Sequence, residues 1–135
     1  MVNEVFSSYY IIVEIDGLQS TRFLECDGMG METEVIEVEE GGVNTSTRKF
    51  PGKTKIYNII LKKGISDNNE LFEWYKSAVR GNCEKKTLSI RLMNSARVEI
   101  KRWDFLKAFP VRWKGPNLDT SDKGFAIEEI EIAFG

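Results

Sequence analysis

The chain has 135 residues, of which 41% are hydrophobic and 30% charged, a balance typical of one folded domain and not of a disordered or membrane-spanning chain. Its 19 basic and 21 acidic residues give a net charge of −2, so no overall basic excess indicates nucleic acid or anionic membranes as partners. The sequence contains no histidine, which removes the usual general base of hydrolases and the commonest ligand of catalytic zinc.

The N-terminal part of the chain predicts β-structure. Residues 8–16 are rich in β-branched and aromatic side chains and end in an Asp-Gly turn pair, so we expect a strand that enters a hairpin, with residues 21–27 as the return strand. Residues 31–40 carry only three aliphatic side chains among many acids, which indicates a solvated strand or ribbon. No basic leader or bilayer-length apolar run precedes these strands, so we expect a protein made in the cytoplasm without membrane insertion.

The next stretch predicts a loop and then a strand. Residues 41–52 are polar, flanked by glycine and interrupted by Pro51, a pattern that favours a long connection over a packed element. Long ordered loops in compact domains usually have a function. Residues 54–63 alternate apolar side chains on both faces, which predicts a strand covered on both sides.

One helix is predicted over about residues 67–80. Asp67 is a candidate N-cap, Glu70 would complete a capping box, and Gly81 follows the last turn. The apolar stripe that would pack on a sheet contains Leu71, Phe72, Tyr75, Ala78 and Val79.

The C-terminal part again predicts strands, over residues 86–93, 97–105 and 106–114 and at the C-terminus. In the last strand the apolar phase changes at Glu128-Glu129, where a β-bulge would restore a single inner face. The fold class is therefore mainly β: residues 1–135 form a single domain, a small antiparallel barrel or sandwich with one flanking α-helix.

No pattern of residues predicts catalysis, a cofactor or a metal site. The acids occur with period two, the spacing of one solvated strand face. Trp103 and Trp113 each follow an arginine, but strand-end tryptophans of a β-rich domain are more often core anchors than nucleic-acid contacts. Cys26 and Cys83 are far apart and favour buried thiols over a disulfide framework.

The charges around the predicted loop are segregated. Residues 32–40 contain five glutamates and no base, whereas residues 48–55 contain four bases and no acid. Two interpretations stay open at this point: the two arms neutralise each other within one subunit, or the acidic edge of one copy meets the basic edge of the next in a head-to-tail contact.

A set of short segments, in this order and spacing, carries a resemblance to a known family. They are Phe23-Leu24-Glu25-Cys26-Asp27-Gly28, Glu34-Val35-Ile36-Glu37, Glu40-Gly41-Gly42 with Asn44, Arg48 to Gly52, Asn58-Ile59, Lys62-Lys63-Gly64, Asn69-Glu70-Leu71 with Trp74, Arg102-Trp103, Ala108 to Pro110, Trp113 to Pro116 and Ala126-Ile127-Glu128. Together they resemble the inner-tube proteins of contractile phage tails and of phage-tail-like contractile injection systems, similar to the haemolysin-coregulated protein of type VI secretion.

The resemblance implies a structural subunit and not an enzyme. Hexameric rings would stack into a hollow tube that conducts cargo or DNA and is driven through a target envelope when a sheath contracts. Residues 39–53 match the family's extended loop, which contacts neighbouring subunits. The expected assembly residues are Glu37, Glu39, Glu40, Gly41, Gly42, Asn44, Arg48, Lys49, Phe50, Pro51, Gly52 and Lys53.

The resemblance also implies partners and a location. The partners would be other copies of the chain, a sheath protein, baseplate, spike and tube-terminating proteins, and a cargo effector or DNA in the lumen. The protein would be made in the cytoplasm of a bacterial cell and then form part of a phage tail or of an injection particle, including particles released from the cell. The alternatives are a tube-like baseplate adaptor and a monomeric β-barrel that binds nucleic acid through the basic residues 48–53.

Overall fold

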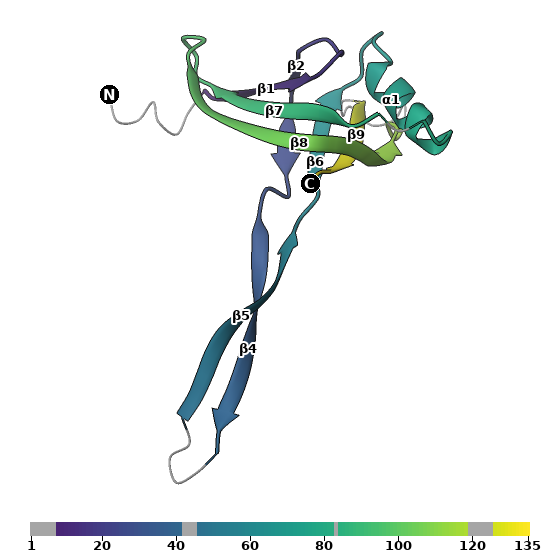
Figure 1. Ribbon diagram of the computed structural model, residues 1–135. Coiled ribbons are helices and arrows are strands. Elements are labelled where there is room, and N and C mark those ends of the chain that lie inside the picture. The colour runs from purple at the N-terminus through teal and green to yellow at the C-terminus, as the bar shows by residue number, and fades with distance from the viewer. Residues whose placement is uncertain (1–7, 42–45, 83, 119–125) are drawn as a thin grey trace.

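A computed structural model of the chain describes residues 8–41, 46–82, 84–118 and 126–135. Within these residues it contains a seven-stranded sheet, a separate two-stranded ribbon and one helix (Figure 1). The elements are β1 (Tyr10–Ile15), β2 (Thr21–Phe23), β3 (Glu25–Asp27), β4 (Met31–Glu40), β5 (Ser46–Ile56), β6 (Ile59–Gly64), α1 (Glu70–Val79), β7 (Lys86–Met93), β8 (Glu99–Lys114) and β9 (Ile127–Ala133).

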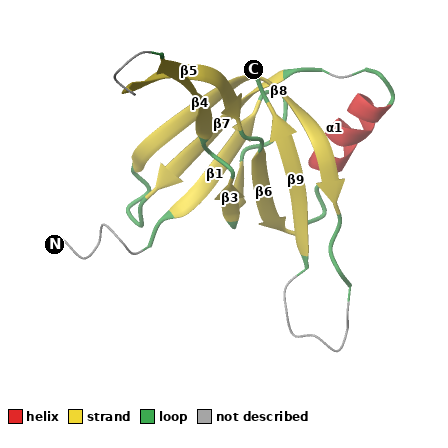
Figure 2. Ribbon diagram, turned by 90° about the horizontal axis from the view of Figure 1, so that it is seen from below, coloured by secondary structure: helices red, strands yellow, loops and turns green. Residues whose placement is uncertain are grey.

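The large sheet is antiparallel and folds over along its longest strand. Its order is β2-β1-β7-β8-β9-β6-β3. The first half of β8 pairs with β7 and the second half with β9, and the change of partner falls beside Lys107, whose φ is 53°. The two outermost strands of this order, β2 and β3, are consecutive in the chain and are joined by Leu24. The result is a sandwich-like body with α1 on its flank (Figure 2), so the predicted fold class is confirmed in its sandwich form.

The core lies between the two halves of the sheet. Alternate side chains of each strand point inward because successive residues of a strand face opposite sides. The buried apolar cluster consists of Val13, Ile15, Phe23, Ile59, Leu61, Leu71, Trp74, Leu88, Ile90, Ala108, Ile130 and Ile132. Trp103 and Trp113 pack against it, as predicted for core anchors.

The helix begins later than predicted and packs through only part of the predicted stripe: Leu71 is buried and Phe72 contacts Trp113, but Val79 is exposed and the unpredicted Trp74 is buried. Asp67 is not the N-cap; the helix is preceded by Asn69, which makes no side-chain cap bond. Instead, the Asn68 side chain accepts a hydrogen bond from the Glu70 amide, 2.8 Å away. The Glu70 carboxylate accepts a hydrogen bond from the backbone N–H of Gln19, and this bond joins the first turn of the helix to the β1–β2 loop. Leu71 and Trp74 are the buried helix residues.

The predicted β-bulge at Glu128-Glu129 is wrong. Glu128 points into the core with Ile130 and Ile132 and is only 5% exposed. The register shift lies instead in β8, where Val111 is the extra residue between the Pro110↔Ile132 and Arg112↔Glu131 pairs.

A buried ion pair explains why Glu128 faces inward. The ammonium of Lys63 lies 3.6 Å from the Glu128 carboxylate, and each side chain is about 6% exposed. The Trp113 indole N–H donates to the same carboxylate at 2.7 Å. The Trp113 ring in turn contacts Phe72 of α1, with ring centroids 4.7 Å apart. A charge that is buried with both a counter-ion and a hydrogen-bond donor can be tolerated in a core.

The predicted strand over residues 54–63 is interrupted. Residues 54–56 belong to β5, and β6 begins at Ile59. At this junction Gly28 has a φ of +89°, and a side-chain Cβ there would lie 2.2 Å from the Asn58 carbonyl oxygen. A glycine is therefore required where the ribbon leaves the body.

The nearby Cys26 is a free thiol, and its pKa is raised to about 11, mainly by burial. Cys83 lies outside the described residues.

Candidate assembly surfaces

The ribbon, formed by β4 and β5, extends away from the sandwich as a long twisted hairpin (Figure 1). The predicted extended loop at residues 39–53 is therefore mostly strand where it is described: residues 39–40 belong to β4 and residues 46–53 to β5. Pro51, which favoured a loop in the sequence because proline usually ends a strand, lies within β5. Each strand of a two-stranded ribbon has a free edge, however, where a missing N–H is tolerated.

Gly52 lies at a β-bulge of the ribbon. The register changes between Thr33↔Thr54 and Val35↔Pro51, so that Gly52 and Lys53 together stand opposite Glu34. A Cβ at Gly52 would lie 3.1 Å from the Ile36 side chain and 3.2 Å from the Glu34 carbonyl oxygen. Glycine therefore lets the two strands approach closely at the bulge.

The register also bears on the segregated charges. Glu37 stands opposite Lys49 and Glu32 opposite Lys55, which favours neutralisation within one subunit at these two positions. Glu39 stands opposite Thr47 and has no such partner. Among the described side chains, none of the ion pairs links β4 to β5. Among the described acids of the ribbon, Glu39 is therefore one that the register places opposite an uncharged residue of β5.

Both faces of the ribbon carry exposed apolar side chains. Cross-strand neighbours share a face, so Val35 and Pro51 lie on one face and Ile36 and Phe50 on the other. Their exposed fractions include 59% for Val35, 48% for Ile36 and 45% for Phe50. The full set of exposed large apolar residues on β4 and β5 is Met31, Val35, Ile36, Val38, Phe50 and Ile56.

The predicted assembly residues lie together on the ribbon as far as the structure describes them. Glu37, Glu39 and Glu40 belong to β4, Gly41 follows it, and residues 48–53 belong to β5. Gly42 and Asn44 lie outside the described residues. Sequence reasoning missed the apolar residues of β4 as candidates, although three aliphatic side chains and Met31, in a strand otherwise made of acids and threonine, were visible in the sequence.

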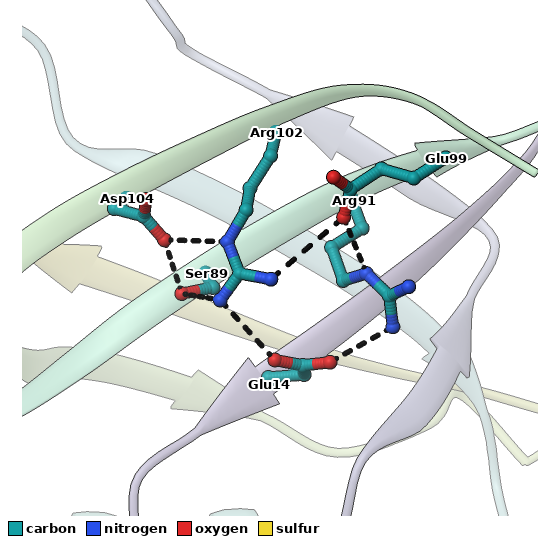
Figure 3. A network of polar contacts seen from close by, with 6 residues as sticks. All are labelled: Glu14, Ser89, Arg91, Glu99, Arg102 and Asp104. Atoms are coloured by element: carbon teal, nitrogen blue, oxygen red, sulfur yellow. Dashed lines mark hydrogen bonds and ion pairs between the residues drawn. The ribbon is translucent and has the colours of Figure 1, made fainter.

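A second polar surface lies on the outer face of β1, β7 and β8 and was not predicted. Figure 3 shows the outer-face network, which consists of Glu14, Ser89, Arg91, Glu99, Arg102 and Asp104. Arg91 lies 2.9 Å from Glu14 and 2.7 Å from Glu99, and Arg102 lies 3.0 Å from Asp104. Hydrogen bonds from Ser89 and from Arg102 lower the pKa of Asp104. Each arginine of the network is therefore neutralised by carboxylates of its own subunit.

The chain matches the family model of the T4-like virus tail tube protein gp19 over residues 7–135. It belongs to this family. The tail tube family assignment confirms the resemblance predicted from the sequence, and the chain is a tail tube protein of the kind found in contractile injection systems. No curated protein matches the chain.

Solved structures agree with the tail tube assignment. A chain of the PVC sheath–tube complex of an extracellular contractile injection system is 30% identical, with a TM-score of 0.80 over 90% of this chain and 82% of that chain. A chain of the PVC sheath/tube terminator is 28% identical, with a TM-score of 0.81 over 96% and 91%. Hcp1 from Flavobacterium johnsoniae, 18% identical with a TM-score of 0.60 over 93% and 89%, shares the fold.

Other kinds of site find little support in the described part of the chain. Over those residues, no three His, Cys, Asp or Glu side chains gather where a metal ion could be held. The described residues also include no helix of the length and hydropathy needed to cross a membrane. The surfaces that stand out on this tail tube protein are therefore the ribbon and the outer sheet face.

Proposed function

We propose that copies of this chain form hexameric rings that stack into a hollow tube, and that the ribbon of each copy is held between neighbouring copies. The observation that carries this proposal is the ribbon itself. An isolated two-stranded hairpin is at best marginally stable in water. Here both faces of such a hairpin carry exposed apolar side chains, and among the described residues β4 and β5 pair only with each other.

The length of the ribbon suits this role. The 11 residues of β5 span about 35 Å at the usual rise of a strand. An arm of that length reaches across a neighbouring domain. Burial of apolar residues on both faces would stabilise the arm and join the copies at once.

The proposed tube acts mechanically. It serves as a conduit for a cargo effector or DNA and is pushed through a target envelope by a contracting sheath, without a catalytic role for this chain. Its partners are a sheath protein and the baseplate, spike and terminating proteins at the two ends. This is supported by the structural matches, which come from sheath–tube, terminator, cap and baseplate assemblies. The chain would be made in the cytoplasm and become part of the assembled particle.

Electron microscopy of the purified protein tests this proposal. We expect six-fold rings or stacked tubes in negative-stain images, either from the chain alone at high concentration or after coexpression with the sheath protein. Rings of another symmetry would contradict the hexamer alone. A population of monomers under all of these conditions would contradict the assembly role.

A further inference from the structure

Three arginines form one row across the outer face of the sheet. The strand register places Arg22 of β2 beside Ile12, Ile12 beside Arg91 of β7, and Arg91 beside Arg102 of β8. Arg91 and Arg102 belong to the outer-face network and are matched by carboxylates of the same subunit (Figure 3). Arg22 is the exception in this row.

Within the described part of the chain, Arg22 has an aromatic neighbour but no carboxylate partner. Its guanidinium stacks over the Tyr10 ring, 4.4 Å from the ring centroid. No described acidic side chain forms an ion pair with Arg22 or with Arg97, which lies in the turn between β7 and β8. Among the described residues, therefore, carboxylates match Arg91 and Arg102 but leave Arg22 and Arg97 available to an anion that this part of the chain does not supply.

Arg22 and Arg97 line the same surface depression, of about 600 Å³, which we call the arginine pocket. The described residues that line it are Ser8, Tyr9, Tyr10, Arg22, Ser95 and Arg97, and none of these is acidic. Guanidinium and hydroxyl groups are donors suited to an oxyanion, and a guanidinium can bind a carboxylate through two parallel hydrogen bonds. The pocket therefore has the chemistry of an anion site.

The backbone of the pocket is held in an uncommon conformation. Ser8 and Arg97 have φ values of 66° and 62°, which non-glycine residues seldom adopt. The turn that carries Arg97 is fixed by the Asn94 side chain, which accepts hydrogen bonds from the amides of Ala96 and Val98 at 2.9 and 3.0 Å. Such strain persists only where the surroundings determine it, and it is concentrated at binding sites.

We propose that the arginine pocket binds Glu39 of a neighbouring copy, a contact that rests on the proposed assembly into rings or tubes. Glu39 is exposed on β4, stands opposite an uncharged threonine, and has no ion-pair partner among the described residues. The ribbon points away from the β7–β8 turn of its own subunit (Figure 1), so Glu39, near the far end of β4, lies far from the arginine pocket of its own subunit. Its length allows Glu39 to reach a neighbouring body.

A charge-swap experiment tests this contact. Arg22→Glu and Glu39→Arg are each expected to raise the protein concentration at half-assembly at least tenfold, because each places like charges together. The double variant R22E/E39R is expected to return within threefold of the wild type, because it restores an opposite-charged pair. Sedimentation velocity measures assembly, and urea denaturation checks that each variant is folded.

A matched control separates this contact from a general charge effect. Lys114→Glu makes the same change in charge at an exposed residue at the far end of β8, and we expect unchanged assembly. The pocket proposal is wrong if R22E assembles like the wild type, or if both single variants are impaired and the double variant is no better. It is also wrong if R22E loses binding of a single-stranded oligonucleotide yet assembles normally, since the pocket then serves a phosphate.

The outcomes also distinguish this contact from the assembly role on which it rests. A wild-type protein that forms no rings or tubes contradicts both. Wild-type tubes that are insensitive to R22E contradict the pocket contact alone.

Discussion

Replacement of Ile36 and Phe50 by threonine is expected to weaken assembly strongly while the subunit stays folded. The two side chains are cross-strand neighbours on one face of the ribbon, about half exposed in the isolated chain. If they are buried between copies, their loss removes about 2 kcal/mol or more per contact, which raises the concentration at half-assembly about thirtyfold. Threonine retains high β-propensity, so the ribbon can still form.

The measurement pairs sedimentation velocity with urea denaturation. We expect the free energy of unfolding of I36T/F50T to stay within about 0.5 kcal/mol of the wild type, because neither residue belongs to the core. Val79→Thr is the matched control: Val79 is 67% exposed at the end of α1, so its replacement should leave assembly unchanged. Normal tubes from I36T/F50T would show that this face of the ribbon is not an interface.

The second large effect is expected on stability, at the Lys63–Glu128 pair. Lys63→Met leaves the Glu128 charge buried without its counter-ion, and we expect a loss of about 3–5 kcal/mol in the free energy of unfolding. The double variant K63M/E128Q is expected to recover most of this loss. It removes both charges, while the glutamine oxygen can still accept the Trp113 hydrogen bond.

Circular dichroism during urea denaturation measures both variants. The neighbouring Lys62 provides the control, because it is 36% exposed and forms surface pairs with Glu25 and Glu129 at 3.5 and 3.7 Å. Lys62→Met should therefore change stability by less than about 1 kcal/mol. A K63M variant as stable as K62M would mean that water, and not Glu128 alone, solvates the Lys63 ammonium in the folded protein.

Local patterns in the sequence predicted the type of most elements. The period-two alternation of residues 86–93 gave a strand with the same bounds as β7, and the acidic stretch at 31–40 was correctly interpreted as a solvated ribbon strand. The sequence predictions were wrong where the conformation of a residue is set by a partner far away in the sequence and not by its local pattern. Glu128 resembled a break in the apolar phase because its partner Lys63 lies on another strand, 65 positions earlier.

The candidate surfaces were only partly predictable for the same reason. Pro51 and the glycines around it resembled a loop, because the sequence does not show that the partner strand leaves a free edge there. The row of Arg22, Arg91 and Arg102 depends on the register of three strand pairs, and no local spacing contains it. The charge segregation was visible, but only the register showed which acids face bases within one subunit.

The most direct test of the account is to find what the ribbon touches in the assembled state. A photoreactive benzoylphenylalanine in place of Phe50 should, on irradiation, join the ribbon of one copy to the body of another. An assembly of isotopically light and heavy protein distinguishes the two cases, because only contacts between copies give mixed-label cross-linked peptides. We expect these mixed products in assembled protein and not in dilute monomer. Cross-links confined to peptides of the same copy, in protein that has formed tubes, would contradict the account.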